Sequence, residues 1–182
     1  MIEGKLINLR AQELTDLDRL HTWINDREVT RFLSMRYQVS YAAEEAWVRD
    51  RASRAIAFGD VHFAIETKDS VHIGGISFHQ TSPEDRRARL GVMIGDKAYW
   101  SKGYGTDAMV TFLRFAFDEM NLHRVDLTVD VENERAIACY RKCGFVEEVR
   151  QRRSRYVRGR YGDQLIMGIL RDEFAALWGT GS

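Results

Sequence analysis

The sequence predicts an α+β fold with three layers, α/β/α, built around a mixed, mostly antiparallel sheet with helices on both faces. Residues 61–95 contain three runs with a period of two, joined by short polar links, and this pattern favours an antiparallel meander. Residues 105–144 follow with a helix, a strand and a second helix, and a strand–helix–strand unit requires one parallel pair. No repeat, low-complexity tract or Pro/Ser-rich linker interrupts the chain. Its 182 residues are therefore predicted to form a single domain over residues 1–182.

The N-terminal half is predicted to contain one strand, two helices and then the three strands of the meander. Residues 5–10 alternate well enough for a strand, and residues 13–25 place their apolar side chains on one helical face. A second helix is predicted over 41–57, with Ser40 as its N-terminal cap. The meander strands are predicted over 61–67, 71–80 and 88–95.

The C-terminal half is predicted to begin with a helix from Gly105 to about Asn121, whose apolar residues recur at helical spacing. Gly144 is expected to end a later helix, because glycine adopts the left-handed conformation that closes helices. The remaining elements are a strand over 124–131, a helix over 133–144, a hairpin over 145–170 and a helix over 171–178.

Composition narrows the classes of function. Lys and Arg total 27, as do Asp and Glu, so the net charge of zero argues against a polyanionic partner. No segment approaches the roughly 18 uninterrupted apolar residues of a membrane span, and the first residues lack the apolar region of a secretion signal. We therefore expect a cytoplasmic protein without a membrane partner. Cys139 and Cys143 lack further ligands at metal-binding spacing, so packed, reduced thiols and no metal site are expected.

A glycine-rich stretch, "WSKGYGTDAM" (residues 100–109), leads directly into a predicted helix. It does not match the P-loop pattern, because Lys102 precedes the glycines. "GYGTDA" (Gly103–Ala108) does match a dinucleotide fingerprint, with Asp126 or Asp130 about 20 residues further on. An NAD(P)-dependent oxidoreductase is therefore one alternative. The segment "DKAYWSK" weakens it, because the loop of that fold should follow its strand almost immediately.

A second motif lies downstream: "NERAIACYRKCGF" (residues 133–145). With the glycine stretch, in the same order and at the usual distance, it resembles the GCN5-related N-acetyltransferase (GNAT) family. The resemblance is greatest to the branch that includes the ribosomal-protein N-terminal and spermidine/spermine N-acetyltransferases. It implies a GNAT-like acyl-CoA N-acyltransferase fold. That family's loop reads (Arg/Gln)-x-x-Gly-x-(Gly/Ala), and Trp100 stands here where Arg or Gln is usual.

The resemblance implies a binding site for acetyl-CoA. Backbone amides and a helix N-terminus would hold the pyrophosphate, and a strand edge would pair with the amides of the pantetheine arm. The residues expected at the pyrophosphate are Trp100, Ser101, Lys102, Gly103, Tyr104, Gly105 and Thr106. Those expected nearer the pantetheine arm or on the second motif are Val92, Met93, Ile94, Asn133 and Lys142. From the residues alone, Asn133 is equally a helix cap.

Tyr140 is the catalytic residue that the resemblance implies. A phenol with a pKa of about 10 stays protonated at neutral pH and can donate a proton to the departing thiolate. The general base is unassigned, because Arg89 stands where many relatives have Glu. A water relay, a substrate amine that arrives partly neutral, or a carboxylate from elsewhere is left open, and the carboxylates considered are Asp26, Glu28, Glu84 and Asp85.

The expected reaction is transfer of the acetyl group of acetyl-CoA to a primary amine by direct attack in a ternary complex. The acceptor is left open among a protein N-terminus, a polyamine and a small amine. The basic segment Arg150–Arg160 is expected to project its arginines into solvent, where they could meet a ribosomal surface. A non-catalytic module that binds coenzyme A or RNA is the remaining alternative, and a homodimer is left open.

Overall fold

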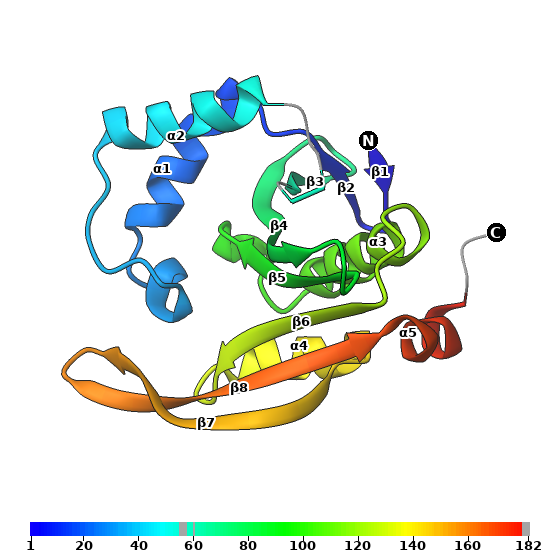
Figure 1. Cartoon of the computed structure of the whole chain (residues 1–182). Coiled ribbons are helices and arrows are strands. Elements are labelled where there is room, and N and C mark those ends of the chain that lie inside the picture. Colours follow the sequence, from blue (N-terminus) through cyan, green and yellow to red (C-terminus); the bar gives the residue numbers. More distant parts are fainter. Residues whose placement is uncertain (55–57, 60, 180–182) are drawn as a thin grey trace.

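One sheet of eight strands organises the chain, and it is described in a computed structural model for residues 1–54, 58–59 and 61–179. The strands lie in the order β1-β2-β3-β4-β5-β6-β8-β7 (Figure 1). Their bounds are β1 (Ile2–Glu3), β2 (Ile7–Arg10), β3 (His62–Thr67), β4 (His72–Ser82), β5 (Arg87–Ile94), β6 (Arg124–Asp130), β7 (Val146–Val157) and β8 (Arg160–Leu170). The helices are α1 (Leu17–Asn25), α2 (Tyr41–Ser53), α3 (Tyr104–Asp118), α4 (Glu134–Cys143) and α5 (Arg171–Trp178), with short 3-10 turns η1 (Leu14–Asp16), η2 (Val29–Phe32) and η3 (Lys97–Tyr99).

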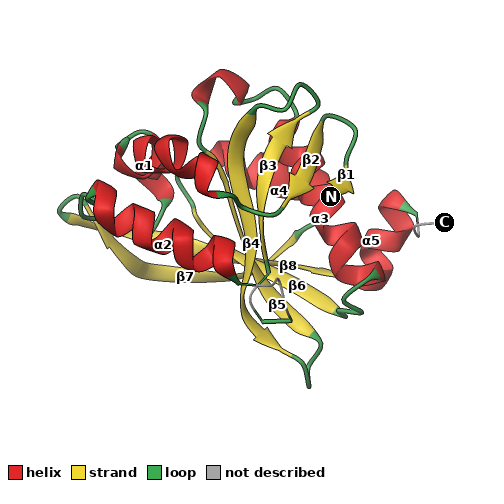
Figure 2. Ribbon diagram, turned by 90° about the horizontal axis from the view of Figure 1, so that it is seen from above, coloured by secondary structure: helices red, strands yellow, loops and turns green. Residues whose placement is uncertain are grey.

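The predicted fold class is confirmed. Within the described chain, β5 and β6 form a parallel pair and the other neighbouring strands are antiparallel. Figure 2 shows α1 and α2 on one face of the sheet and α3, α4 and α5 on the other. In the part of the chain that has been described, no helix combines the length and the apolar character needed to cross a membrane.

Most predicted elements are found close to their expected positions, with three differences. Strand β1 was not predicted, because two residues carry no periodicity. The predicted helix over 13–25 divides into η1 and α1. The helix predicted over 41–57 is described to Ser53, and its residues 55–57 lie outside the described residues. The expected cap is confirmed, since the Ser40 hydroxyl accepts a hydrogen bond from the Ala43 amide at 3.2 Å.

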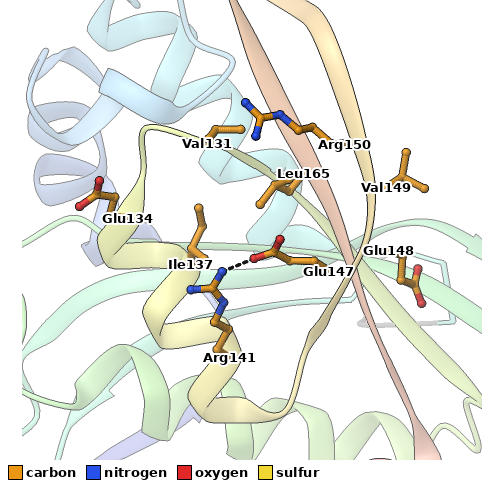
Figure 3. A pocket seen from close by; sticks show the side chains of 9 residues that line it. All are labelled: Val131, Glu134, Ile137, Arg141, Glu147, Glu148, Val149, Arg150 and Leu165. Atoms are coloured by element: carbon orange, nitrogen blue, oxygen red, sulfur yellow. Dashed lines mark hydrogen bonds and ion pairs between the residues drawn. The ribbon is translucent and has the colours of Figure 1, made fainter.

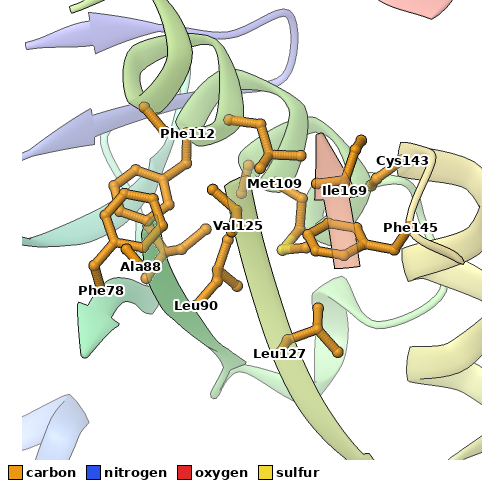
Figure 4. Packing of buried hydrophobic residues seen from close by; sticks show 14 of the residues in the cluster. Phe78, Ala88, Leu90, Met109, Phe112, Val125, Leu127, Cys143, Phe145 and Ile169 are labelled. Atoms are coloured by element: carbon orange, nitrogen blue, oxygen red, sulfur yellow. The ribbon is translucent and has the colours of Figure 1, made fainter. Parts of the chain in front are cut away.

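The main hydrophobic core lies between α3 and the sheet (Figure 4). The apolar stripe predicted for α3 supplies five fully buried side chains: Met109, Phe112, Leu113, Ala116 and Phe117. Phe112 stacks on Phe78 of β4 with 4.2 Å between ring centroids. A second, smaller core joins α1 and α2 through Leu17, Leu20, Trp23 and Val48, and Met93 of β5 packs against it.

A buried ionic network connects the 3-10 turn η1 to the sheet. The Asp16 carboxylate accepts two hydrogen bonds from the Arg10 guanidinium, at 2.7 and 2.9 Å, and a third from the Glu13 amide. His72 Nδ1 lies 3.1 Å from Asp16 Oδ1. The network therefore ties η1 to β2 and β4, under the helices that cover one face.

Candidate active site

Strands β5 and β6 diverge in the middle of the sheet. Among the described residues they pair only over Arg87–Arg89 and Arg124–Asp126, while β5 continues to Ile94 and β6 to Asp130. The diverging half of β6 still pairs with β8 on its other side. One edge of β5 from Leu90 to Ile94 therefore faces the gap between the parallel strands, and a strand edge of this kind can pair with an extended chain of amides.

The residues predicted on this edge have side chains that pack against the hydrophobic cores. Val92 and Ile94 pack against the main core, and Met93 packs against the α1–α2 core on the opposite face. On its other side, β5 is paired with β4 across the same residues. Because these side chains pack against the two hydrophobic cores, the backbone groups of the edge are left for the predicted contact with pantetheine.

The glycine loop turns sharply where α3 begins. Gly103 has φ of +90° and Ser101 has φ of +59°, so both lie in the left-handed region. Gly103 is the N-cap residue of α3 and has no side chain to accept from the first amides of the helix. Gly105 lies inside the first turn, where an added Cβ would meet only Ile94 and Cys139 at 3.8 and 3.9 Å. The predicted tight turn is thus confirmed at Gly103, whereas at Gly105 the missing side chain leaves space beside the helix.

Trp100 is held from two sides. Its indole Nε1 donates to the Ile94 carbonyl at 2.7 Å, and the Arg135 guanidinium stacks over its ring at 3.8 Å from the centroid. Arg135 comes from the first turn of α4 and was not predicted. The stack places a cation beside the loop position where the family usually has Arg or Gln. The neighbouring loop residues differ in exposure, with Ser101 and Lys102 exposed and Tyr104 packed edge-on against Tyr99.

Thr106 uses its hydroxyl within the protein. Its Oγ1 lies 3.3 Å from the Cys139 thiol, which joins the start of α3 to α4. Hydrogen bonding with Cys143 lowers the pKa of the Cys139 thiol. In the described part of the chain no cluster of His, Cys, Asp and Glu could hold a metal ion. Both thiols lie at the α3–α4 contact, with Cys143 Sγ 3.9 Å from the Thr106 carbonyl.

Helix α4 is closed at both ends as predicted. The Asn133 side chain accepts a hydrogen bond from the Ala136 amide at 3.3 Å, which is the capping role. Gly144 ends the helix in the left-handed conformation with φ of +105°. Lys142 is exposed near this end. The contacts of Asn133 and Lys142 with a cofactor stay predictions.

Tyr140 is partly buried on α4 and packs against the main core. The ring centroids of Tyr140 and Phe145 are 6.1 Å apart. Burial raises the pKa of Tyr140 above its ordinary value, because the phenolate is desolvated more than the phenol. The hydroxyl therefore stays protonated over the whole neutral range, as a proton donor requires.

The carboxylates considered as general bases are engaged elsewhere. Asp26 and Glu28 both bind the Lys97 ammonium, at 2.9 and 2.8 Å, and its hydrogen bond lowers the pKa of Asp26. Glu84 and Asp85 lie in the turn that joins β4 to β5, where Ser82 donates to Asp85 at 2.9 Å.

Arg89, at the position where relatives often have Glu, is itself paired. Its Nε donates to Asp126 of β6 at 2.7 Å, and that carboxylate is buried. Arg124 adds a second cation 3.8 Å from the other Asp126 oxygen. Asp126 is therefore bound between the guanidinium groups of Arg89 and Arg124.

Three of the six arginines in the basic segment Arg150–Arg160 form ion pairs with neighbouring acids of the described chain. Arg150 pairs with Asp163 and Arg160 with Glu132, both at 2.8 Å and on the surface. Arg155 departs from the expected projection into solvent: its side chain is 14% exposed and pairs with Asp130 at 2.5 Å. It also donates to the carbonyls of Phe32 and Leu33. That expectation is wrong for Arg155, which fastens the segment between α1 and α2 to the end of β6.

A cavity of about 650 Å³ lies between α4 and β7 (Figure 3). Glu147 receives a hydrogen bond from Arg141 across it. Its lining mixes apolar and charged side chains: Val131, Glu134, Ile137, Arg141, Glu147, Glu148, Val149, Arg150 and Leu165. Because it contains none of the residues predicted to bind the cofactor, this cavity lies outside the candidate site.

The dinucleotide-binding alternative is not favoured by the geometry. Its fold requires a mostly parallel, doubly wound sheet with the loop directly after a strand. Here β5 and β6 are the parallel pair of a mostly antiparallel sheet, and η3 separates β5 from Gly103. Asp126, the acid expected at the ribose, binds Arg89 instead.

Comparison with known proteins agrees with this geometry. Residues 7–146 match the acetyltransferase (GNAT) domain family. The SPbeta prophage-derived uncharacterized N-acetyltransferase YokL of Bacillus subtilis is 33% identical over 173 residues, covering 94% of this chain and 93% of YokL. Spermidine N(1)-acetyltransferase of Vibrio cholerae is 28% identical over 172 residues, covering 92% and 95% of the two chains.

A solved structure supports the same family assignment. The crystal structure of spermidine N-acetyltransferase from Vibrio cholerae in complex with CoA and spermine superposes with a TM-score of 0.84 and 26% identity. The match covers 94% of this chain and 99% of that chain. The chain therefore belongs to the acetyltransferase (GNAT) family and is an N-acetyltransferase.

Proposed function

We propose that the gap between β5 and β6 holds acetyl-CoA and that the acetyl group passes to a primary amine by direct attack within a ternary complex. One observation carries the proposal. The parallel strands β5 and β6 diverge after three paired residues, and the chain after β5 reaches α3 through Gly103, which has the left-handed conformation. The pantetheine arm would pair with the free edge of β5 between Leu90 and Ile94. Its pyrophosphate would then reach the N-terminus of α3.

The start of α3 suits a pyrophosphate for physical reasons. The first amides of a helix lack partners within the helix, and the helix dipole adds about half a positive charge there. Arg135, stacked on Trp100 by the same loop, would supply a full positive charge in place of the family's Arg or Gln. Lys102 is exposed on the loop and would add another.

Replacing Gly103 by alanine is expected to weaken acetyl-CoA binding. Alanine in the left-handed region costs roughly 1–2 kcal/mol, so the loop would relax away from the conformation that points its amides at the ligand. We expect the Kd for acetyl-CoA, measured by calorimetry, to rise about 5- to 30-fold. Gly159→Ala is the matched control, because Gly159 also has positive φ, +83°, but lies in the turn between β7 and β8. Equal Kd values for both variants would contradict the assignment of the loop.

The acceptor is proposed as a primary amine, with polyamines the first to test because the relatives in Vibrio cholerae are named for spermidine. The acidic residues at the start of α2 do not favour polyamines over the other acceptors. Glu44 is buried, and Glu45 pairs with Arg49 of the same helix at 2.8 Å. A protein N-terminus and a small amine therefore stay in the proposal.

An acceptor panel tests the function. Spermidine, spermine, peptides with a free α-amino group and small primary amines would each be incubated with acetyl-CoA, and released thiol would be measured. At 100 times its Kd, acetyl-CoA should also stabilise the protein by about 2.7 kcal/mol, or about 5–11 °C in melting temperature. Acetyl-CoA binding without thiol release from any amine would favour the non-catalytic module, and stabilisation by NAD(H) alone would favour an oxidoreductase.

The cellular setting belongs to the same proposal. A cytoplasmic location, a homodimer and a ribosomal surface as a docking partner are each compatible with the proposed reaction. The ion pairs of Arg150, Arg155 and Arg160 leave less free positive charge for an RNA surface than the sequence suggests.

A further inference from the structure

His79 of β4 lies on the face of the sheet that α1 and α2 cover, next to β5. It stands opposite Arg89 in the β4–β5 register. Its imidazole reaches over the next residue on that face, because a Cβ built on Gly91 would lie 2.4 Å from His79 Nε2. Gly91 is followed, two residues on, by Met93, whose side chain packs on the α1–α2 core. The ring therefore lies over Gly91, within the Leu90–Ile94 stretch proposed to pair with the pantetheine arm.

The surroundings of His79 keep its imidazole neutral. The side chain is exposed to solvent, yet partial burial among its neighbours lowers its pKa, and the charges of Arg51 from α2 and Arg89 from β5 add to the effect. His62 of β3 contacts Arg51, with Nη1 and Nδ1 3.4 Å apart. A protonated His79 would lie near the positive charges of Arg51 and Arg89. The ring is therefore deprotonated at neutral pH and can accept a proton.

Three acids on the same side of the sheet are bound to cations. Asp126 is held by Arg89, and Asp26 and Glu28 are held by Lys97. His79 differs from them in being uncharged, solvent-accessible and placed against β5 itself.

We propose that His79 is the general base for the acceptor amine, directly or through one water, in place of the Glu replaced by Arg89; this rests on the proposed function. The ammonium of the acceptor gives one proton to His79, and the free amine attacks the thioester carbonyl. The C–S bond breaks as the carbonyl re-forms, and the thiolate takes a proton from Tyr140. The phenolate recovers a proton from the new amide nitrogen, and His79 releases its proton to solvent, so one proton is produced per turnover.

The test is His79→Gln, measured as kcat against pH from 5.5 to 9.5 with acetyl-CoA and the best acceptor of the panel saturating. For the wild type we expect kcat to fall on the acid side, below the ordinary histidine pKa of about 6.5, as the imidazole becomes protonated. For the variant we expect kcat at pH 7.5 to fall by about 10²- to 10⁴-fold, and the acid limb to disappear. The Kd for acetyl-CoA should stay within about twofold of the wild-type value.

His123→Gln is the matched control, because His123 is an exposed histidine before β6 and has no part in the site. It should keep the wild-type rate and pH profile. A His79→Gln variant with an unchanged kcat, or with a lower kcat but the same acid limb, would overturn the inference while leaving the proposed function intact. If the wild-type protein acetylated no amine, both the role of His79 and the proposed function would be contradicted. Should His79→Gln melt well below the wild type, His79→Asn would take its place in the same assay.

Discussion

Replacing Tyr140 by phenylalanine is expected to lower kcat by about 10²- to 10⁴-fold, the contribution typical of a general acid. The ring would keep its packing against the core and Phe145, so only the hydroxyl is lost. Without the hydroxyl, coenzyme A would leave as an unprotonated thiolate. The pKa of its thiol is about 8.5, as for free cysteine. Thiol release would give kcat, and calorimetry would give a Kd for acetyl-CoA close to that of the wild type.

Tyr156→Phe supplies the control for this prediction, because Tyr156 is an exposed tyrosine at the tip of the β7–β8 hairpin. Burial raises the pKa of Tyr140, so ionisation of its phenol should not reduce kcat at any pH below the ordinary tyrosine value of about 10. A Tyr140→Phe variant that keeps kcat within about threefold would show that the thiolate is protonated by another group.

The Asp16→Asn variant is expected to lose about 3 kcal/mol of unfolding free energy. Removing one partner of a buried ion pair typically costs about 3–5 kcal/mol, and the lower end applies because Arg10 keeps its bond to Glu66 at 2.6 Å. For a chain of this size the melting temperature should fall by about 6–12 °C. Asp18→Asn is the control, since Asp18 lies on α1 but is exposed. Equal losses for both variants would contradict the structural role of the network.

The stability difference should also depend on pH. Burial alone would raise the pKa of Asp16, but hydrogen bonds from Arg10 and His72 outweigh it and lower the pKa below the ordinary range. A carboxyl whose folded pKa is lowered contributes stability above its unfolded pKa, about 3.9, and loses it as pH falls toward the folded value. Denaturant unfolding should therefore show the gap between wild type and Asp16→Asn narrowing below about pH 4. A gap that is constant from pH 7 to pH 3 would contradict this sign.

The periodic elements of this fold are well predicted from the sequence, because burial of one face imposes a period of two or 3.6 on the residues themselves. The α3 stripe from Met109 to Phe117 and the meander are found where their patterns place them. Strand β1 is different, because its two residues form a strand only by pairing with Leu9 and Asn8 of β2. Asp16, at the junction of η1 and α1, contacts Arg10 of β2 and His72 of β4, and the helical pattern of residues 13–25 does not display these contacts.

Within the candidate site, local features were predictable and contacts between distant segments were not. Gly103 and the cap at Asn133 follow from backbone requirements that a sequence displays directly. The stack of Arg135 on Trp100 joins the first turn of α4 to the loop before α3, and these two segments meet only in the folded chain. Similarly, Arg155 alternates like its neighbours, but Asp130 and the carbonyls of Phe32 and Leu33 hold it inward.

A crystal structure of the protein with bound acetyl-CoA would test the central claim most directly. The account predicts the pyrophosphate on the backbone amides of Gly103–Thr106, the pantetheine arm along Leu90–Ile94, and the thioester sulfur within hydrogen-bond reach of the Tyr140 hydroxyl. Acetyl-CoA bound in another part of the chain, such as the cavity between α4 and β7, would contradict it, as would a sulfur far from Tyr140.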